Sequence, residues 1–525
     1  MKTGNIVFII DAFLPYVRNE IGDGLAEEDW FFNSISYTYI PLIKMCENLK
    51  KDGIDFKFGI VFEPVLCDML NDPFLQEKYS VHLEKKIAFA KKELERFSIS
   101  EKPGEFIKYN LKLFNEHKEI FNSCGKNILK KFNSLSEEGF IEILATTATR
   151  CFLPFLEQVP EAIAAQIEMG QISFREYFSS IPSGFWLPAL GYSGCLDKII
   201  RSYGFDYTVL DSKGFLLADK VPAAGVFSAA GSDTGLKFLA ADECAYQMVY
   251  KSTKDFAANP VYIDCENDLG FKLSEDYLSA VFDTSKGRRA IGFRYWSKDK
   301  NETYYDMKKA KEQIKLDAAA FVDYQERNLN TVKSKTECSS PVSVFVCSSD
   351  FFGKKWCEGI AWLNQVFRIM HGKSSLKPLL PIKACNIEKE LFNIKPFFSS
   401  MFDSGYAGEL ITGKNNWMYH YVLKITKRMI ELTEMFPKDS AVKESVLNAA
   451  AREVFLLQSY YWPLYYAEGY FEEFAEKRFI EHVKAFSFAY DELGANNPPT
   501  KWLAKRWKKY PILKDVNYMF FSRKK

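Results

Sequence analysis

The chain has 525 residues, of which 47% are apolar and 26% are charged, and its formal net charge is +1. This composition is typical of a globular protein with a large core, and the near-neutral charge excludes a long-range attraction to nucleic acid or to an anionic membrane. The length predicts two or three structural units, although a barrel can absorb about 250 residues as one domain.

The first part of the sequence alternates apolar strands with helices. Residues 6–10 are predicted to form a buried strand, residues 30–49 an amphipathic helix, and residues 56–62 a second strand. Residues 73–135 are charged and amphipathic, so they are predicted to form helices inserted after the second strand. The pattern then continues with predicted strands at 140–148 and 206–211 and a helix at 194–203.

The second part changes from α/β to helical. Residues 215–300 contain short β-like runs, among them LKFLAA at 236–241 and AIGFRYW at 290–296. A helix is predicted at 308–330 and a late strand at 341–350. From about residue 415 the pattern is helical to the end, most clearly at 447–459. The fold class predicted is therefore α/β, a barrel-like region followed by an all-helical region.

The cysteines and the N-terminus predict the compartment. Eleven cysteines are scattered without a CxxC motif, which favours reduced thiols in a cytoplasmic protein over a disulfide framework. The apolar run at 6–10 ends at Asp11 and is too short for a signal peptide, and no apolar stretch reaches about 18 residues. No HxxxH or HExxH motif occurs, so we expect no metal and no cofactor.

Six segments resemble, in order along the chain, sequence motifs of glycoside hydrolase family 57. The resemblance is nearest to the α-1,4-glucan branching enzymes of that family. The six segments lie at 11–20, 27–49, 142–156, 348–368, 398–422 and 447–464. The resemblance implies a seven-stranded (β/α) barrel at 1–410 with a helical insertion at about 70–138, and a helical domain at 411–525 that helps cover the cleft.

The WLPALGY stretch at 186–192 is similar to the family's WLPECGY, whose Glu is the catalytic nucleophile, and here Ala189 takes its place. Ser348 stands at the position of the family's acid/base Asp. Retaining enzymes need two carboxyl groups about 5 Å apart. An alanine cannot form the glycosyl ester, and a serine hydroxyl is too weak an acid to replace the proton donor. We therefore assign no catalytic residue.

Other family positions also differ. Asp11 and Phe13 stand where the family has two His, Arg150 where it has a third, Met401 in place of a cleft Trp, and Tyr461 in place of a substrate-site Asp. We expect Asp11 and Arg150 to form an ion pair. The alternative is that Asp11 and another carboxylate, Asp350, have taken over catalysis.

The segments at 11–16, 146–151, 186–192 and 347–356 each follow a predicted strand. In a parallel barrel such segments meet at one mouth, because the chemistry lies at the carboxyl ends of the strands. The residues expected to line a substrate cleft there are Asp11, Trp30, Arg150, Trp186, Trp296, Asp350, Trp356, Asp403, Tyr461 and Trp462. Tryptophan rings can stack on glucose units, but each of them is also a candidate for core packing. Together with Arg150, Lys354 and Lys355 would favour an anionic ligand.

Three hypotheses on function follow from these residues. The first is a catalytically silent relative of the branching enzymes that binds α-glucan or maltooligosaccharide, or regulates a protein partner. The second is an active branching or transglycosylating enzyme with relocated catalytic residues. The third is a structural or interaction protein that no longer recognises sugar. None of the three involves nucleic acid or a membrane.

Overall fold

The computed structural model describes residues 4–20, 26–98, 101–250, 255–285, 287–301, 303–372, 375–402 and 406–523. The chain folds into two compact units. The first contains residues 1–60, 69–142 and 242–384, and the second contains residues 61–68, 143–241 and 385–525. The elements at which the chain passes between the units are β2 (Phe58–Phe62), α3 (Pro64–Asn71), β3 (Ile141–Leu144) and α15 (Pro381–Cys385).

The sheet of the first unit is built on β1 (Gly4–Ala12), which pairs in parallel with β8 (Val342–Ser348) and with β9 (Leu376–Pro378). Its apolar run from Ile6 to Ile10 is at most 1% exposed, as expected for a parallel strand covered on both faces. The strands predicted at 6–10 and 341–350 are thus confirmed. The register of β1 and β8 places Asp11 beside Ser348.

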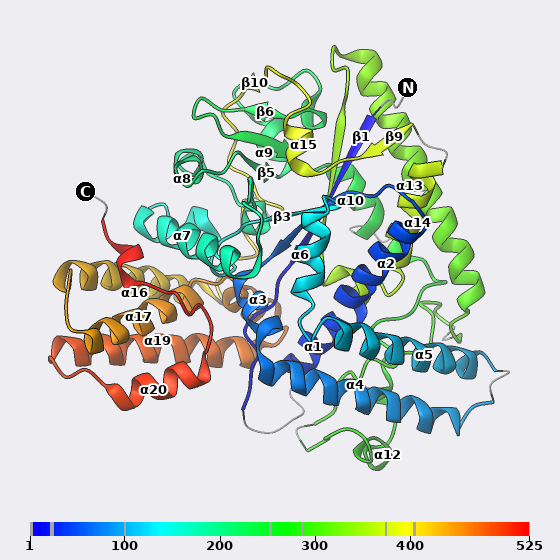
Figure 1. Cartoon of the computed structure of the whole chain (residues 1–525), viewed down its shortest axis with the longest axis horizontal. Helices are drawn as coiled ribbons and strands as arrows, with labels where there is room; N and C mark the ends of the chain where they lie inside the picture. Colours follow the sequence, from blue (N-terminus) through cyan, green and yellow to red (C-terminus); the bar gives the residue numbers. More distant parts are fainter. Residues whose placement is uncertain are drawn as a thin grey trace. The chain divides into compact units, whose positions relative to one another are not determined.

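Helices make up most of the rest of this unit (Figure 1). They are α1 (Ala26–Ser34), α2 (Ile40–Lys51), α4 (Pro73–Leu94), α5 (Lys102–Ser123), α6 (Leu129–Glu137), α10 (Glu243–Tyr250), α11 (Leu269–Lys272), α12 (Glu275–Ser279), α13 (Met307–Lys335) and α14 (Gly359–Gly372). Asp72 caps α4 by accepting a hydrogen bond from the Phe74 amide, and Pro73 opens the helix. Helices α4 and α5 pack side by side and fill the range in which inserted helices were predicted.

The second unit contains a five-stranded sheet in the order β10, β6, β7, β5, β4. Its strands are β4 (Gly184–Phe185), β5 (Tyr207–Leu210), β6 (Ala230–Gly231), β7 (Lys237–Ala240) and β10 (Phe392–Asn393). Only the β6–β7 pair is antiparallel among these. The accompanying helices are α7 (Pro160–Tyr177), α8 (Leu196–Ser202) and α9 (Ser212–Leu216). Strand β4 leads directly into the segment that carries Ala189.

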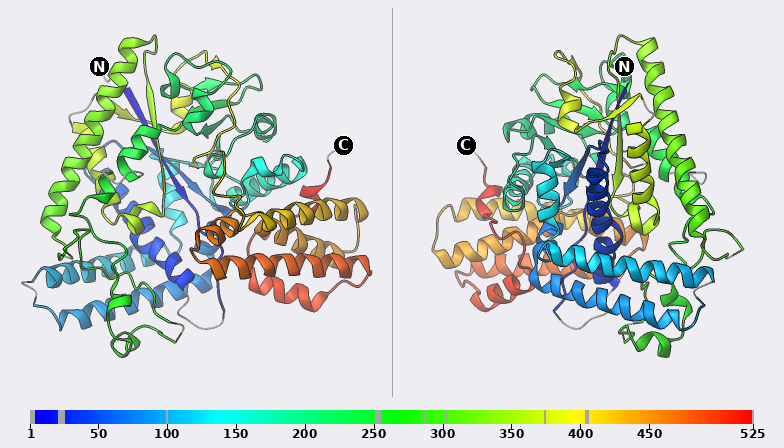
Figure 2. Two further views of the ribbon diagram at one scale, coloured as in Figure 1. Left: turned by 180° about the vertical axis from the view of Figure 1, so that it is seen from behind. Right: turned by 45° about the vertical axis from the view of Figure 1, so that its right-hand side comes forward.

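The C-terminal helices of the second unit pack on one another, as both ribbon figures show (Figures 1 and 2). They are α16 (Asn416–Met435), α17 (Ala441–Leu457), α18 (Tyr461–Glu468), α19 (Glu472–Gly494) and α20 (Thr500–Lys509). Buried Glu453 of α17 lies 2.8 Å from Nδ1 of His482 in α19 and accepts a hydrogen bond from Arg506 of α20. Burial opposes ionisation, but His482 and Arg506 outweigh it and lower the pKa of Glu453 to about 2.

One predicted strand is wrong. The run at 290–296 forms no strand and makes only a bridge between Trp296 and Tyr304. The reason is a competing acceptor, because the Asp268 carboxylate accepts hydrogen bonds from the amides of Ile291 and Gly292 at 2.8 Å each. The mixed α/β fold and the helical C-terminal region are confirmed, whereas closure into seven strands and the domain boundary near 410 stay predictions. Within the described ranges, no helix is long and apolar enough to cross a membrane.

Candidate functional site

The backbone at Ala189 is strained. Ala189 has φ 55° and ψ 22°, and Leu190 has φ 52°, so two consecutive residues with side chains adopt the left-handed conformation. For L-residues this costs roughly 1–2 kcal/mol each. The turn is held by the Met401 amide, which donates to the Ala189 carbonyl at 2.9 Å, and by the Gly191 amide, which donates to the Pro188 carbonyl.

Ala189 is 1% exposed and belongs to an apolar cluster with Phe152, Ala407, Leu410 and Tyr460. Further side chains pack against it, namely those of Phe155, Met401, Phe402, Tyr406, Tyr419 and Leu464. The surroundings of the methyl group are thus hydrocarbon and aromatic rings. A carboxylate at this position would lose its hydration without gaining a charged partner from within the cluster.

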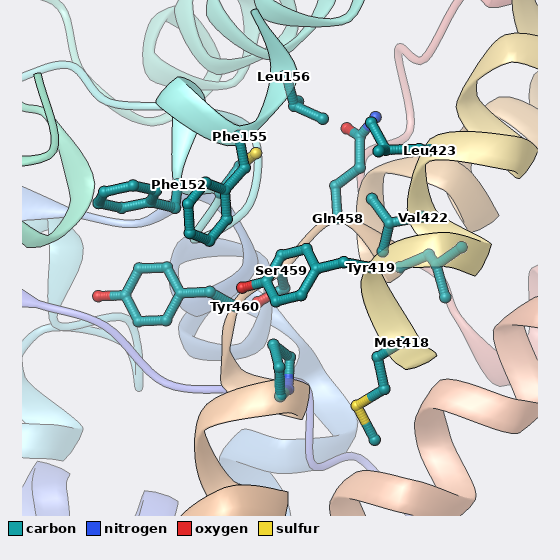
Figure 3. Close-up of a pocket in the computed structure, with 13 residues that line it drawn as sticks. Phe152, Phe155, Leu156, Met418, Tyr419, Val422, Leu423, Gln458, Ser459 and Tyr460 are labelled. Atoms are coloured by element: carbon teal, nitrogen blue, oxygen red, sulfur yellow. The ribbon is translucent and has the colours of Figure 1, made fainter. Parts of the chain in front are cut away.

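A small cavity adjoins this cluster, and Phe152 and Tyr460 belong to both (Figure 3). Its volume is about 10 Å³, which is barely enough to hold one water molecule. Figure 3 shows the ring of Phe155 next to Phe152 and Tyr419, and its centroid lies 4.7 and 4.9 Å from those of its neighbours. A glucose ring does not fit into this cavity.

A buried carboxylate that the sequence analysis missed lies in the same unit. Glu63 directly follows β2 and is 3% exposed. Its Oε1 accepts from the Arg150 amide at 2.9 Å, and its Oε2 accepts from the Tyr461 hydroxyl at 2.6 Å. Arg150 Nε in turn donates to the Tyr460 hydroxyl at 2.6 Å. The sequence could have indicated Glu63, because it is an acidic residue next to the carboxyl end of an apolar strand. The same feature led to the selection of Asp11.

The structure brings only some of the residues predicted for the cleft together at Glu63. Arg150 and Tyr461 lie together around Glu63, and burial raises the pKa of the Tyr461 hydroxyl. Asp11 belongs to the first unit and Arg150 to the second, and their ion pair stays a prediction. Ala189 and Ser348 are divided between the units in the same way. Asp403 lies outside the described residues.

The first unit brings Trp30, Asp350 and Lys354 together. The indole Nε1 of Trp30 donates to both oxygens of Asp350 at 3.0 Å, and Lys354 Nζ lies 3.1 Å from each of the same oxygens. Lys354 Nζ also lies 4.0 Å from the centroid of the Trp30 ring. Burial lowers the pKa of Lys354 to about 8, against the opposing charge of Asp350. The arrangement is a shielded ion pair.

Ser348 ends β8 and acts on the backbone that follows. Its hydroxyl accepts a hydrogen bond from the Asp350 amide at 3.1 Å, and its side chain is partly exposed. The amide of the next residue, Ser349, donates to the carbonyl of Asp11. The serine thus shapes the turn that presents Asp350, which is a structural role available to a hydroxyl at the end of a strand.

Three of the five tryptophans expected in the cleft are enclosed by protein. Trp356 has no exposed surface and packs against Trp362 with ring centroids 5.5 Å apart. Trp186 and Trp462 are each 2% exposed. The indole N–H of Trp462 donates to the Leu456 carbonyl, whereas that of Trp186 has no acceptor among the described residues. In this structure these three rings are packed among protein side chains, and their place in a substrate cleft stays a prediction.

Trp296 is partly exposed but its ring is occupied. It stacks on Tyr304 with centroids 6.3 Å apart, and Lys272 Nζ lies 4.3 Å from its centroid. Trp30 is 5% exposed and is engaged by Asp350. Among the described residues, no group of three or more His, Cys, Asp or Glu side chains is arranged to hold a metal ion.

Comparison with known proteins identifies the scaffold. Residues 7–287 match glycosyl hydrolase family 57, and residues 421–521 match the C-terminal region of 1,4-alpha-glucan branching enzymes. A 1,4-alpha-glucan branching enzyme of Thermococcus kodakarensis is 25% identical over 526 aligned positions, which cover 93% of this chain and 74% of that protein.

Two solved structures share the fold along the whole chain. The α-amylase AmyC of Thermotoga maritima superposes with a TM-score of 0.92 at 29% identity, and all of both chains is covered. A branching enzyme of Pyrococcus horikoshii superposes with a TM-score of 0.88 at 22% identity and covers all of this chain and 97% of its own. The two relatives are named for different reactions, so the fold alone does not select one. The chain belongs to glycosyl hydrolase family 57.

Proposed function

We propose that this protein of α-glucan metabolism binds α-glucan or maltooligosaccharide, or regulates a protein partner, without transferring or hydrolysing glucosyl units. The observation that carries the proposal is the apolar cluster around Ala189, the residue that the resemblance aligns with the family's nucleophile. Glycosyl transfer with retention needs a carboxylate there and a second carboxyl group about 5 Å away. Ser348 at the acid/base position supports the same conclusion.

The state of the other carboxylates argues against relocated catalysis. Asp350 accepts from Trp30 and from Lys354 on both oxygens. Glu63 is buried and accepts from Arg150 and Tyr461. A nucleophile or an acid/base must reach the anomeric carbon or the glycosidic oxygen of the sugar, and groups fixed in this way would have to abandon their partners first.

Incubation of the wild-type protein with amylose tests the absence of catalysis. We expect no new α-1,6 branches and no new reducing ends, because removal of a central catalytic group lowers the rate by about 10⁴–10⁶ in the protease precedent. Branching that is abolished by Asp11→Ala or Asp350→Ala would overturn the proposal in favour of relocated catalysis. New reducing ends that survive both changes would also overturn it.

Retention on immobilised glycogen, and titration with maltoheptaose at millimolar concentration, test binding. We expect saturable binding of maltoheptaose, and Asp350→Asn tests whether the contact between Trp30 and Lys354 belongs to the binding surface. Asp439→Asn is the matched control, because Asp439 pairs with Lys443 at the same i,i+4 spacing and 3.0 Å distance. Absence of binding would exclude a glucan-binding role and leave only a partner-regulating or structural one.

A cytoplasmic location is part of the proposal. All eleven cysteines are free thiols, which suits a reducing compartment. Fractionation of the native cells would place the protein with cytoplasmic enzymes, and its appearance in the secreted fraction would contradict this part.

A further inference from the structure

Two cysteines that lie 92 positions apart in the sequence meet in the first unit. The sulfur atoms of Cys265 and Cys357 are 3.5 Å apart, and both side chains are partly exposed. A disulfide bond has a length of about 2.05 Å. Closure of the bond therefore requires the two sulfur atoms to approach by about 1.5 Å.

A hydrogen bond from one segment to a side chain of the other lies next to the pair. The amide of Ile263, two residues before Cys265, donates to Oε1 of Glu358, the residue after Cys357, at 3.1 Å. Ile263 also forms an antiparallel bridge with Ser297. The two segments that carry the thiols are thus held side by side, a condition for a disulfide with little strain.

A cation lies beside the sulfurs. Arg294 donates from its guanidinium to Cys357 Sγ at 3.5 Å. The hydrogen bond between the thiols lowers the pKa of Cys265 and raises that of Cys357, and the charge of Arg294 favours the thiolate at both. Glu358 faces the pair as the opposing acid, and burial raises its pKa to about 7. Proximity to a cation is the setting in which thiols react with disulfides.

We propose that Cys265 and Cys357 form a thiol–disulfide exchange site that reacts reversibly with a low-molecular-weight disulfide of the glutathione type. The Cys265 thiolate attacks one sulfur of the small disulfide, forms a mixed disulfide and releases one thiolate. Cys357 then loses its proton to that thiolate and attacks the Cys265 sulfur, which releases the second small thiolate; this thiolate takes up from water the proton that Cys265 lost on ionisation. The protein pair is oxidised by two electrons, and the small disulfide is reduced to two thiols. This site does not depend on whether the chain binds glucan.

The oxidised bond would restrain the segment that carries Lys354. Cys357 follows the turn Phe351–Lys355, and its Sγ lies 3.7 Å from the Gly353 carbonyl of that turn. A link from Cys357 to Cys265 would fix this turn to the loop around Ile263. Amide hydrogen exchange over residues 351–358 is expected to slow after oxidation.

Equilibration of the native full-length protein in buffers of oxidised and reduced glutathione, followed by alkylation and mass spectrometry, tests the site. We expect one intramolecular disulfide that links the peptides of Cys265 and Cys357, with loss of two hydrogen masses and full recovery on reduction. In the Cys357→Ser variant we expect Cys265 to retain one glutathione, because the resolving thiol is missing. Cys244→Ser, which removes an exposed cysteine outside the pair, is the matched control and should oxidise like the wild type.

Equal alkylation of both thiols in every glutathione buffer, with no linked peptide, would overturn the proposal. So would an intramolecular disulfide that survives in Cys265→Ser at the wild-type yield, since another pair would then be responsible. Arg294→Gln should raise the pH at which Cys265 is half alkylated, whereas an unchanged pH would contradict the role of the guanidinium.

Discussion

Substitution of Ala189 by glutamate tests directly whether protein fills the space around this side chain. The side chain of Ala189 is 1% exposed and lies among Phe152, Leu410 and Tyr460. Insertion of the larger side chain costs about 1–3 kcal/mol through overpacking. A buried carboxyl group without a partner costs about 1–3 kcal/mol more. The expected destabilisation is therefore about 2–6 kcal/mol even where the new carboxyl group is protonated.

The pH dependence of this variant separates a filled site from an open cleft. Burial among apolar groups raises the pKa of a carboxyl group, so the folded state would bind the proton more tightly than the unfolded chain. Stability must then fall as the pH rises above the unfolded value of about 4.3, by about 1.4 kcal/mol per unit, until the folded pKa is passed. A shift of about 2–3 units adds about 3–4 kcal/mol of destabilisation at neutral pH.

Urea denaturation followed by circular dichroism at pH 5 and pH 8 provides the measurement. Ala189→Gln is the matched control, because glutamine has nearly the same size and polarity as glutamate but no ionisable group. We expect the glutamate variant to lose stability relative to the glutamine variant between the two pH values. If both variants are equally stable at pH 5 and pH 8, the new side chain reaches water, and the inference that protein fills this site is refuted.

Three further outcomes follow from the second unit. Ala189→Gly should change the free energy of unfolding by less than about 1 kcal/mol. The glycine relieves the left-handed strain of about 1–2 kcal/mol, but it loses the buried methyl group and adds backbone entropy to the unfolded chain, which together cost about the same. Denaturant titration measures the difference. Glu453→Gln should cost about 1.5–3 kcal/mol at pH 7, since it removes the charge that His482 and Arg506 share, while Arg506 keeps its pair with Glu481. The depressed pKa of Glu453 stabilises the wild type above about pH 4.5, so its advantage should vanish as the pH falls towards 2. Burial raises the pKa of Asp68 to about 7, which destabilises the wild type progressively from about pH 4 to 7, and Asp68→Asn should remove that slope in thermal melts.

The elements that the sequence predicted well are those whose burial leaves a pattern. Strands β1 and β8 are covered on both faces, so their residues form continuous apolar runs bounded by polar ones. Helices α4 and α5 have a charged face and an apolar face. The run at 290–296 has strand-like composition as well, but the carboxylate of Asp268 captures its amides, and the sequence gives no sign of that long-range partner.

The candidate site was predictable in residue type but not in conformation. The resembling motif drew attention to position 189, yet alanine and leucine have no preference for the left-handed region that Ala189 and Leu190 adopt. Tryptophan occurs both in cores and at sugar-binding surfaces, so only the structure distinguishes buried Trp356 from partly exposed Trp296. Glu63 was overlooked because no resembling motif included it, although it ends a strand as Asp11 does.

The strained turn at Ala189 and Leu190 is held in place by the packing around it. Two left-handed residues without a catalytic group cost roughly 2–4 kcal/mol and would relax unless the surrounding structure fixed them. Here the Met401 amide binds the Ala189 carbonyl, and the Met401 side chain packs against the same cluster. A Cβ at Gly191 would lie 2.3 Å from the Phe152 ring, so that ring closes tightly over the turn. Apolar packing around this unrelaxed turn makes the backbone at Ala189 and Leu190 a structural element of the second unit.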